Sequence, residues 1–267
     1  MRIALVTGAS AGIGRAFARH LAAQGGHRLV LVARSAAILD AFAGELRDHH
    51  ATEAEVIAAD LTVPADRRRV IDRLTDQATP VDLLINAAGM GYSVPTTSNT
   101  FEREEYLLDI NARSKLELTL HALRAMGGRG SGEIVNVSSV AALGPAWLDS
   151  TYGASQAYLL AATESLAYSA RVRRSGVRLM ALLPGDTRTE FNARAGIPDS
   201  TTPDWRWLSA ERLVRDALRD LRAGRITSIP SRRYKVLAWA LRHGPRSVAA
   251  RVALDFGTLP PAPPVTR

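Results

Sequence analysis

Short runs of aliphatic residues alternate along the chain with longer segments of helical periodicity. Residues 13–24, 36–49, 64–77, 101–126 and 152–175 carry the helical patterns, and the aliphatic runs include "IALVTG", "RLVLVAR", "EVIAAD", "VDLLINAAG", "EIVNVSS" and "VRLMALLPG". These runs do not alternate between apolar and polar positions, which is typical of strands buried on both faces of a parallel sheet. The pattern therefore predicts the α/β class, with a single doubly wound parallel sheet (a Rossmann fold) and helices on both faces.

The length of the chain suits one large core, so we expect a single Rossmann-type domain over residues 1–257. Within it, 192–257 are predicted to form a variable substrate-loop and C-terminal region. Trp205 and Trp207 in this region either line an apolar pocket or take part in ordinary packing. The proline-rich segment 258–267 is predicted to be a flexible tail.

Local signals predict where several helices begin and end. The glycine pairs 25–26 and 127–128 are expected to end helices, and "GRGSG" at 128–132 is predicted to be a loop before a strand. Ser209 is a predicted N-cap of the helix "SAERLVRDALRDLRAG", with Gly224 beyond its end. A short strand, "RITSIP", is expected next.

Composition excludes several kinds of chemistry. The 267 residues contain no cysteine and the six histidines show no ligand spacing, so we expect no metal site. The formal net charge is +8, yet no groove motif or interleaved aromatic residues indicate nucleic-acid binding. We find no signal peptide and no apolar stretch long enough to span a bilayer, so a cytoplasmic location is expected. Residues 232–251 carry six basic and no acidic side chains; packing on a partner subunit or over the substrate is favoured over peripheral membrane contact.

The first strand leads into "VTGASAGIGRAFA", where Gly8, Gly12 and Gly14 stand between strand and helix. Glycines at these places let the backbone turn sharply and approach a pyrophosphate, while the helix directs its positive N-terminus at the anion. A tight turn without a ligand is the alternative interpretation. The position in the first strand–helix unit favours a dinucleotide site.

The end of the second strand bears on cofactor choice. An acidic residue there hydrogen-bonds the ribose hydroxyls of NAD, whereas an arginine pairs with the 2′-phosphate of NADP. In "LVLVARSAAILD", Arg34 follows the strand directly and no acidic residue occurs before Asp40. NADP is therefore favoured, and Ser10 and Ser35 are candidates for further hydrogen bonds to the phosphate. A solvated surface arginine is the alternative.

Five motifs in this order resemble those of the short-chain dehydrogenase/reductase family. They are "TGASAGIG", "NAAG" at 86–89, Asn111 in the next long helix, "IVNVSS" ending at Ser139 with Tyr152 thirteen residues later, and "PGDTRTEF" at 184–191. The resemblance implies an enzyme that moves hydride between a nicotinamide cofactor and a carbonyl or alcohol. Because the family commonly associates through the helices predicted here at 101–126 and 152–175, we expect a homodimer or homotetramer.

The resemblance also implies contacts along the whole cofactor. The residues after the third strand would touch the adenine, the "NAAG" turn would lie beside the cofactor, and the segment after "PG" would wall the nicotinamide and reach its carboxamide and the pyrophosphate. The predicted set is Gly8, Ser10, Gly12, Ile13, Gly14, Arg34, Asp60, Leu61, Asn86, Ala87, Gly89, Tyr152, Gln156, Pro184, Gly185, Thr187 and Thr189.

The catalytic residues of the family find three matches and one departure. In the family a tyrosine exchanges a proton with the substrate oxygen, a serine holds that oxygen, a lysine lowers the tyrosine pKa and binds the nicotinamide ribose, and an asparagine positions a relay water. Tyr152, Ser139 and Asn111 match, whereas Gln156 stands in the place of the lysine. An amide can hydrogen-bond ribose hydroxyls but lowers a phenol pKa little. Reduction needs a neutral phenol, so it suffers less than alcohol oxidation.

These residues favour an NADP-dependent reductase of a small or medium apolar carbonyl substrate, with activity altered or reduced by Gln156. The alternatives are a redox-neutral enzyme (a dehydratase, isomerase or cyclase) and a non-catalytic nucleotide-binding protein. The chain has two lysines, Lys115 and Lys235. Lys115 follows Asn111 by four residues on the same predicted helix face, and a surface or interface lysine is the favoured interpretation over a replacement cation.

Overall fold

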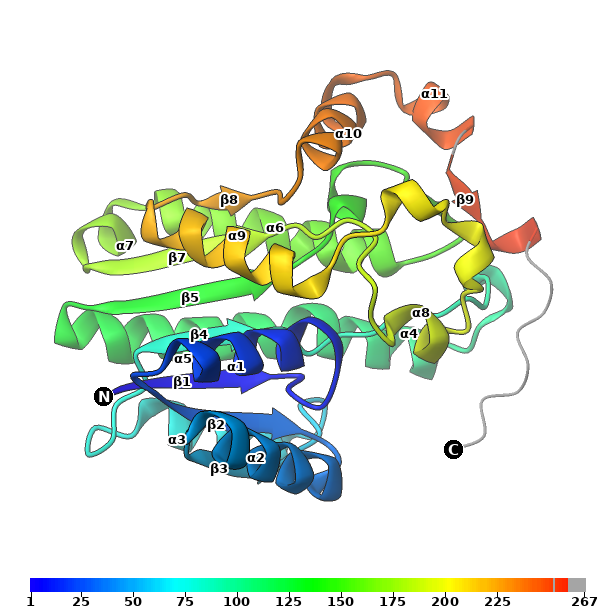
Figure 1. Ribbon diagram of the computed structural model, residues 1–267. Coiled ribbons are helices and arrows are strands. Elements are labelled where there is room, and N and C mark those ends of the chain that lie inside the picture. The colour runs from blue at the N-terminus through cyan, green and yellow to red at the C-terminus, as the bar shows by residue number, and fades with distance from the viewer. Residues whose placement is uncertain (252, 259–267) are drawn as a thin grey trace.

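A seven-stranded parallel sheet forms the centre of the protein (Figure 1). The computed structural model describes residues 1–251 and 253–258, and the sheet has the strand order β3-β2-β1-β4-β5-β7-β8. Its strands are β1 (Arg2–Thr7), β2 (His27–Ala33), β3 (Ala54–Ala58), β4 (Leu83–Asn86), β5 (Gly132–Val137), β7 (Val177–Leu182) and β8 (Thr227–Ser228). Every strand pair in it is parallel, which confirms the predicted doubly wound fold.

Helices cover both faces of this sheet (Figure 1). Apolar side chains of α1, α2 and α9 form the core on one face, and those of α3, α5 and α6 form most of the core on the other. The helices are α1 (Gly12–Gln24), α2 (Ala36–His50), α3 (Pro64–Thr75), α4 (Phe101–Leu108), α5 (Ser114–Arg129), α6 (Tyr152–Tyr168), α7 (Ala170–Arg174), α8 (Phe191–Ala195), α9 (Ala210–Arg222), α10 (Arg232–His243) and α11 (Arg246–Arg251).

Several shorter elements complete the chain. A second, two-stranded sheet pairs β6 (Trp147–Leu148) with β9 (Leu254–Asp255). A π-helical stretch, η2 (Asp109–Arg113), joins α4 to α5. The 3₁₀ segments are η1 (Thr96–Ser98), η3 (Val140–Leu143), η4 (Asp199–Thr201), η5 (Asp204–Arg206) and η6 (Phe256–Thr258).

Some predicted boundaries are confirmed and others are wrong. Gly25, with φ +70°, ends α1, and the Ser209 hydroxyl caps α9 by accepting from the Arg212 N–H. The pair 127–128 does not end its helix: α5 continues to Arg129, and the left-handed residue is Gly130. The expected "GRGSG" loop is therefore much shorter.

Two further expectations need correction. The predicted helix over 152–175 breaks at Ser169, whose hydroxyl caps α7, and the predicted strand "RITSIP" is reduced to β8. Residues 259–267 of the predicted flexible tail lie outside the described residues.

The sheet places one edge where a ligand is expected. Strand order reverses between β1 and β4, and ligands of doubly wound sheets bind beyond the carboxyl ends of the strands at such a point. Thr7 and Asn86 end these two strands in register, and Val137 ends the neighbouring β5. The motif residues gather around this edge.

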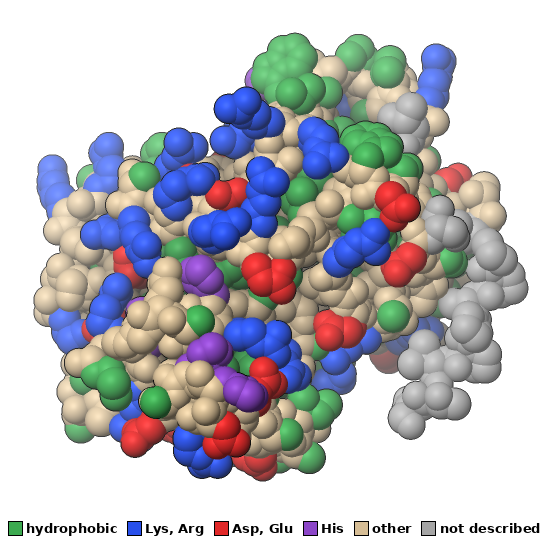
Figure 2. Space-filling view, in the orientation of Figure 1, with side chains coloured by type: hydrophobic (Ala, Val, Ile, Leu, Met, Phe, Trp, Pro, Cys, Tyr) green, Lys and Arg blue, Asp and Glu red, His purple; other side chains and the backbone are tan. Residues whose placement is uncertain are grey.

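The helices α10 and α11 stand apart from the sheet layers (Figure 1). Val236, Trp239 and Val248 expose more than half of their surface there, and Figure 2 shows apolar side chains beside basic ones over these helices. Among the described residues, no helix is long and apolar enough to cross a membrane.

Candidate functional site

The glycine-rich turn has the geometry of an anion cradle. Gly8 has φ +68°, and a Cβ there would lie 2.8 Å from the Ala88 nitrogen; a Cβ on Gly14 would lie 2.4 Å from the Gly8 carbonyl oxygen. Only glycine allows this close approach of turn, helix and the neighbouring strand end. Ser10 and Ile13 lie half-buried in the same turn. The N-cap residue of α1, Ala11, has no side chain that could cap the helix, so the N–H groups of the first turn face outward toward an anion.

An acidic residue of the chain already lies at this helix end. The Gly12 N–H donates to a carboxylate oxygen of Glu190 over 2.9 Å. Glu190 belongs to the "PGDTRTEF" segment, and Thr189 beside it packs against Gly12. The cradle therefore accepts a negatively charged oxygen in the structure, as a dinucleotide pyrophosphate site must.

Arg34 stands at the end of β2 in a short hydrogen-bonded chain. Its guanidinium donates to the Tyr106 hydroxyl over 3.1 Å, and that hydroxyl donates to Asp60, also over 3.1 Å. Burial raises the pKa of Asp60, but hydrogen bonds from Thr62 and Tyr106 and the charge of Arg34 outweigh this and hold it below its usual value. Leu61 is buried beside Asp60. Ser35 instead caps α2, accepting from the Ile38 N–H.

The "NAAG" turn is fixed by β1 and by buried amides. The Thr7 hydroxyl accepts from the N–H groups of Ala87 and Ala88 at 3.1 Å. Asn86 is fully buried and donates to Thr119, to the Lys115 carbonyl and to the Asn136 amide oxygen, so it cross-links strand and helix rather than capping its own turn. Gly89 is exposed at the end of this turn.

Ser139 and Tyr152 meet at the same edge of the sheet. Ser139 follows β5 and caps η3 through the Ala141 N–H, while Tyr152 opens α6 and is 8% exposed. Burial raises the pKa of the Tyr152 phenol to about 12; its hydrogen bond with Ser139 opposes the rise and the charge of Asp186 adds to it. The phenol is therefore neutral at physiological pH.

Asn111 holds the "NAAG" loop against α6 from within η2. Its amide exchanges two hydrogen bonds of 2.9 Å with the backbone of Met90 and donates to the Ser155 hydroxyl over 3.2 Å. The π-helical turn supplies the register for this contact, in keeping with the frequent place of π-bulges at functional sites. Next to Ser155, Gln156 is 2% exposed, and its side-chain oxygen has no hydrogen-bond partner among the described residues.

Lys115 is buried, which corrects the interpretation as a surface or interface lysine. It is 2% exposed, and its ammonium donates to the Val137 carbonyl over 2.7 Å. Burial lowers its pKa to about 7. The helix face shared with Asn111 points into the protein because α5 packs on the sheet by that face.

The "PG" segment is tied to both Ser139 and the C-terminal helices. The Pro184 carbonyl accepts from the Val140 N–H over 3.0 Å, next to Ser139. A Cβ on Gly185 would overlap the Tyr234 ring of α10. Tyr234 donates to the Asp186 carboxylate over 2.8 Å, and Thr187 bonds back to the Gly185 carbonyl.

Aromatic side chains cover Tyr152. Trp147 stacks on it with ring centroids 4.4 Å apart, Phe191 lies 5.7 Å away, and Phe256 packs edge-on against Trp147. β9, beside Phe256, pairs with β6 and so closes the chain over this side. Trp205, one of the two tryptophans expected either to line an apolar pocket or to take part in ordinary packing, is 63% exposed and does not join this cluster.

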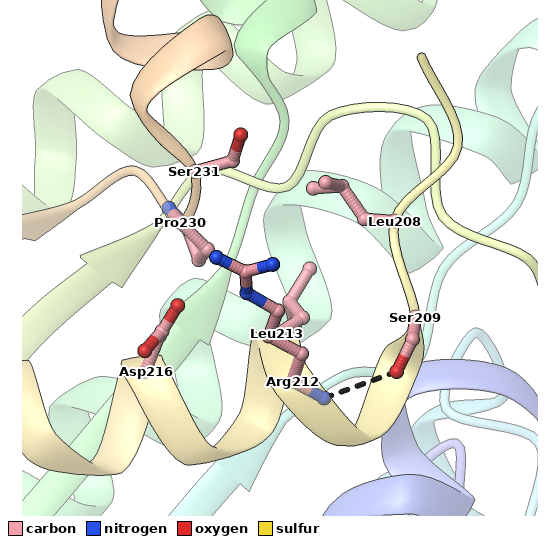
Figure 3. Close-up of a pocket in the computed structure, with 7 residues that line it drawn as sticks. All are labelled: Leu208, Ser209, Arg212, Leu213, Asp216, Pro230 and Ser231. Carbon is pink, nitrogen blue, oxygen red and sulfur yellow. Dashed lines mark hydrogen bonds between the residues drawn. The ribbon is translucent and has the colours of Figure 1, made fainter. Parts of the chain in front are cut away.

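Two surface cavities lie apart from these residues. The cavity in Figure 3, between α9 and the segment before α10, has a volume of about 10 Å³, enough for about one water. The other, of about 210 Å³, lies under α10 beside Trp239. Neither is lined by Ser139 or Tyr152.

Several residues of the site are not singled out by the sequence patterns, among them Tyr106, Trp147, Asp186, Glu190 and Tyr234. Asp186 and Glu190 lie inside the quoted "PGDTRTEF" motif, so the signal was present and went unused. The other three are brought to the site by tertiary packing, and no local pattern marks them.

A glycine-rich turn between the first strand and helix of a doubly wound sheet is typical of dinucleotide-binding Rossmann folds. The chain belongs to the short chain dehydrogenase family, whose model matches residues 2–198. It is 33% identical over 184 residues to an uncharacterized oxidoreductase of Staphylococcus epidermidis, a match that covers 69% of this chain and 77% of that protein.

Solved structures resemble the whole fold. A short-chain dehydrogenase from Sphingobium yanoikuyae in complex with NADPH is 36% identical, with a TM-score of 0.81 over 90% of this chain and 93% of that one. The bulky-bulky ketone specific alcohol dehydrogenase from Comamonas testosteroni is 31% identical, with a TM-score of 0.77 over 90% and 92%. The family and the NADPH-bound relative support a nicotinamide cofactor for this chain.

Proposed function

We propose that the protein is an NADP-dependent reductase that converts the carbonyl of a small or medium apolar substrate into an alcohol. The observation that carries this proposal is the buried Tyr152 phenol at the same edge of the sheet as Ser139; burial raises the pKa of this phenol to about 12 and so keeps it protonated. A neutral phenol is the form that reduction needs, because the proton must pass to the substrate oxygen.

The chain's own residues divide the work at the carbonyl. Ser139 donates a hydrogen bond to the substrate oxygen and polarises it, Tyr152 donates the proton, and Asn111 keeps the "NAAG" loop and α6 in register. NADPH, when bound, supplies the hydride. Gln156, which we take to replace the family lysine, offers its unpaired amide oxygen to ribose hydroxyls.

NADP is proposed rather than NAD because Arg34, and no carboxylate, directly follows β2. Tyr106 orients the guanidinium, and an arginine binds a 2′-phosphate through paired hydrogen bonds. The NADPH complex of the Sphingobium yanoikuyae relative supports this choice. We also propose the remaining cofactor contacts expected from the sequence. They are Gly8, Ser10, Gly12, Ile13 and Gly14 at the glycine-rich turn, Asp60 and Leu61 after β3, Asn86, Ala87 and Gly89 in the "NAAG" turn, and Pro184, Gly185, Thr187 and Thr189 in the "PG" segment.

The substrate is proposed to carry an apolar group next to its carbonyl. Trp147, Phe191 and Tyr152 present aromatic surface beside the reacting hydroxyl, which favours a hydrophobic group next to the carbonyl. The ketone preference in the name of the Comamonas testosteroni relative agrees with this chemistry.

Turnover of a ketone panel with NADPH tests the proposal. We expect alcohol formation, and Tyr152→Phe should lower kcat by at least about 100-fold, because general acid catalysis contributes on that order. Tyr158→Phe is the matched control: Tyr158 is on the same helix but 51% exposed, and activity should be unchanged. A product formed without NADPH oxidation would favour the redox-neutral alternative, to which the uncharged Gln156 also points.

A further inference from the structure

Lys115 is a buried amine without a countercharge. Among the described residues, no carboxylate lies within salt-bridge distance, and its hydrogen bond is to the Val137 carbonyl. The charged groups Glu117, on the same helix, and Arg67 of α3 pair with each other over 2.6 Å rather than with Lys115. On α6, the titratable group at the candidate catalytic edge of the sheet is Tyr152. An ammonium in such a place costs folding free energy that a methionine would not.

The contacts of Lys115 place its amine near the "NAAG" turn, Asn111 and the end of β5. A Cβ on Gly89 would lie 3.5 Å from the amine and 2.9 Å from the Asn111 amide oxygen. Val137, whose carbonyl accepts the hydrogen bond from the amine, is followed by Ser138 and Ser139. Gly89 itself is exposed at the turn proposed to lie beside the cofactor. The amine thus lies next to the Gly89 turn and the Asn111 amide.

The same contacts bring Lys115 toward Gln156. The Ser138 hydroxyl donates to the Gln156 carbonyl over 3.0 Å, and Asn111, one turn before Lys115, bonds to Ser155. Two hydrogen-bonded bridges therefore connect the surroundings of the two side chains. Gln156 has a buried side-chain oxygen without a partner, while the amine of Lys115 has donors left after its bond to Val137.

We propose that Lys115 supplies the buried positive charge of the catalytic site, so that the cation missing from position 156 on α6 comes from α5. Lys115 acts through Tyr152 and is a positioning residue. This inference rests on the proposed reductase function.

The charge acts on the proton step. When Tyr152 gives its proton to the substrate oxygen, the O–H bond of the phenol breaks, the alcohol O–H bond forms, and tyrosinate remains. A protonated Lys115 in the low-dielectric interior stabilises that anion. The proton that restores the phenol comes from the ammonium or from solvent, and solvent reprotonates the amine. The overall reaction consumes one carbonyl, one NADPH and one proton, and yields alcohol and NADP⁺.

Kinetics of Lys115→Met tests this assignment against the matched control Lys235→Met, the exposed second lysine of the chain. We expect kcat for ketone reduction to fall at least about tenfold in Lys115→Met, with the NADPH Kd changed by less than about threefold. In the wild type, kcat should decline as pH rises through the pKa of Lys115, and the variant should lose that limb. Lys235→Met should match the wild type in every respect.

Moving the lysine gives a second test. Lys115→Met combined with Gln156→Lys returns a cation to α6 and should recover most of the lost kcat. If the single variant fails to fold, Lys115→Gln replaces it, since that side chain keeps a donor to Val137. Equal kcat and equal pH profiles in the wild type and Lys115→Met would overturn the inference and leave the reductase function standing. A wild type that transfers no hydride overturns the function, and the inference with it.

The titration of the Lys115 amine can be measured directly by NMR, independently of turnover. With only two lysines, protein labelled with ¹³C at lysine Cε gives two signals, assigned with Lys115→Met. We expect one to titrate near pH 7 and to move on addition of NADP⁺, while the Lys235 signal stays in place. A Lys115 signal that ignores NADP⁺ contradicts a place under the cofactor site.

Discussion

At the scale of single residues, burial rather than sequence identity decides which groups carry chemistry. The sequence predicts a surface or interface position for Lys115, and it shows Gln156 as a departure from the family motif. Both are buried at the same edge of the sheet as Ser139 and Tyr152. The sequence shows the residue types and their spacing, but which helix face packs inward depends on the tertiary structure.

Cofactor preference is tested at Arg34. If its guanidinium pairs with a 2′-phosphate, the wild type should bind NADPH at least about tenfold tighter than NADH, and Arg34→Ala should remove about 1.4 kcal/mol or more of that preference. Calorimetry with both cofactors measures it. Arg28→Ala, at the opposite end of β2, is the control and should keep the preference. Equal affinity of the wild type for both cofactors would contradict the assignment.

The buried lysine predicts a pH dependence of stability. The pKa of Lys115 falls from 10.5 to about 7 on folding, so between these values the unfolded state binds more protons and the free energy of unfolding rises with pH. From pH 7 to 9 the wild type should gain about 2 kcal/mol relative to Lys115→Met, since each pKa unit is worth about 1.4 kcal/mol. Urea unfolding of both proteins at the two pH values, at one protein concentration, measures the difference. A difference that does not change with pH would show that the amine titrates normally.

At the scale of elements, the segment after β7 connects three parts of the site. Glu190 lies on the N-terminus of α1, Pro184 contacts η3, and Asp186 bonds to Tyr234 of α10. A pyrophosphate bound at the glycine-rich turn, as proposed, would compete with the Glu190 carboxylate for the same N–H groups, so we expect this segment to move when the cofactor enters.

Removal of the Glu190 charge should strengthen cofactor binding. Glu190→Gln is expected to lower the NADPH Kd by about threefold to tenfold, because the pyrophosphate no longer displaces a carboxylate. The cofactor-free variant should lose about 0.5 kcal/mol of stability, the usual size of an acidic side chain at a helix N-terminus. Calorimetry and thermal unfolding measure the two effects. Asp199→Asn, a charge removal in the same region, is the control; an unchanged or weaker affinity in Glu190→Gln would contradict the prediction.

Much of the fold is accessible from sequence because parallel strands buried on both faces leave an unbroken apolar signal. β1, β2, β4, β5 and β7 carry this signal. Helix ends are less accessible. Gly127 and Gly128 lie inside α5, and neither has a positive φ. The helix ends at Gly130, which adopts the left-handed conformation.

The candidate site likewise contains residues that the sequence predicts and residues that it does not. Motifs with characteristic spacing predict Gly8, Asn111, Ser139 and Tyr152. Trp147 and Phe256 reach Tyr152 through the pairing of β6 with β9, two segments far apart in the sequence. Such contacts have no local pattern.

At the scale of the whole molecule, one outer face of α6 is suited to self-association. Its exposed positions Ala154, Tyr158, Ala161, Ser165 and Tyr168 follow helical spacing and carry no charge. An uncharged stripe of small and aromatic residues on a long helix fits a two-fold contact between copies of the chain.

The oligomeric state is tested on this face. We expect a dimer or tetramer by light scattering at micromolar concentration, and Tyr158→Glu should shift it to a smaller species, because two copies of the charge would meet across the axis. Trp239→Ser, on the exposed face of α10, is the control and should leave the assembly intact. A monomeric wild type would contradict the prediction, and a Trp239→Ser variant that dissociates would move the interface to α10.

The central claim is that the chain transfers hydride from NADPH to a carbonyl with Tyr152 as the acid. The most direct measurement is mass spectrometry of the alcohol formed from an aryl ketone with NADPH deuterated at C4, using both C4 epimers, with wild type and Tyr152→Phe. The account predicts one deuterium in the product from one epimer only, and loss of that product in the variant. Product without deuterium from either epimer, or full deuterium transfer by Tyr152→Phe, would contradict it.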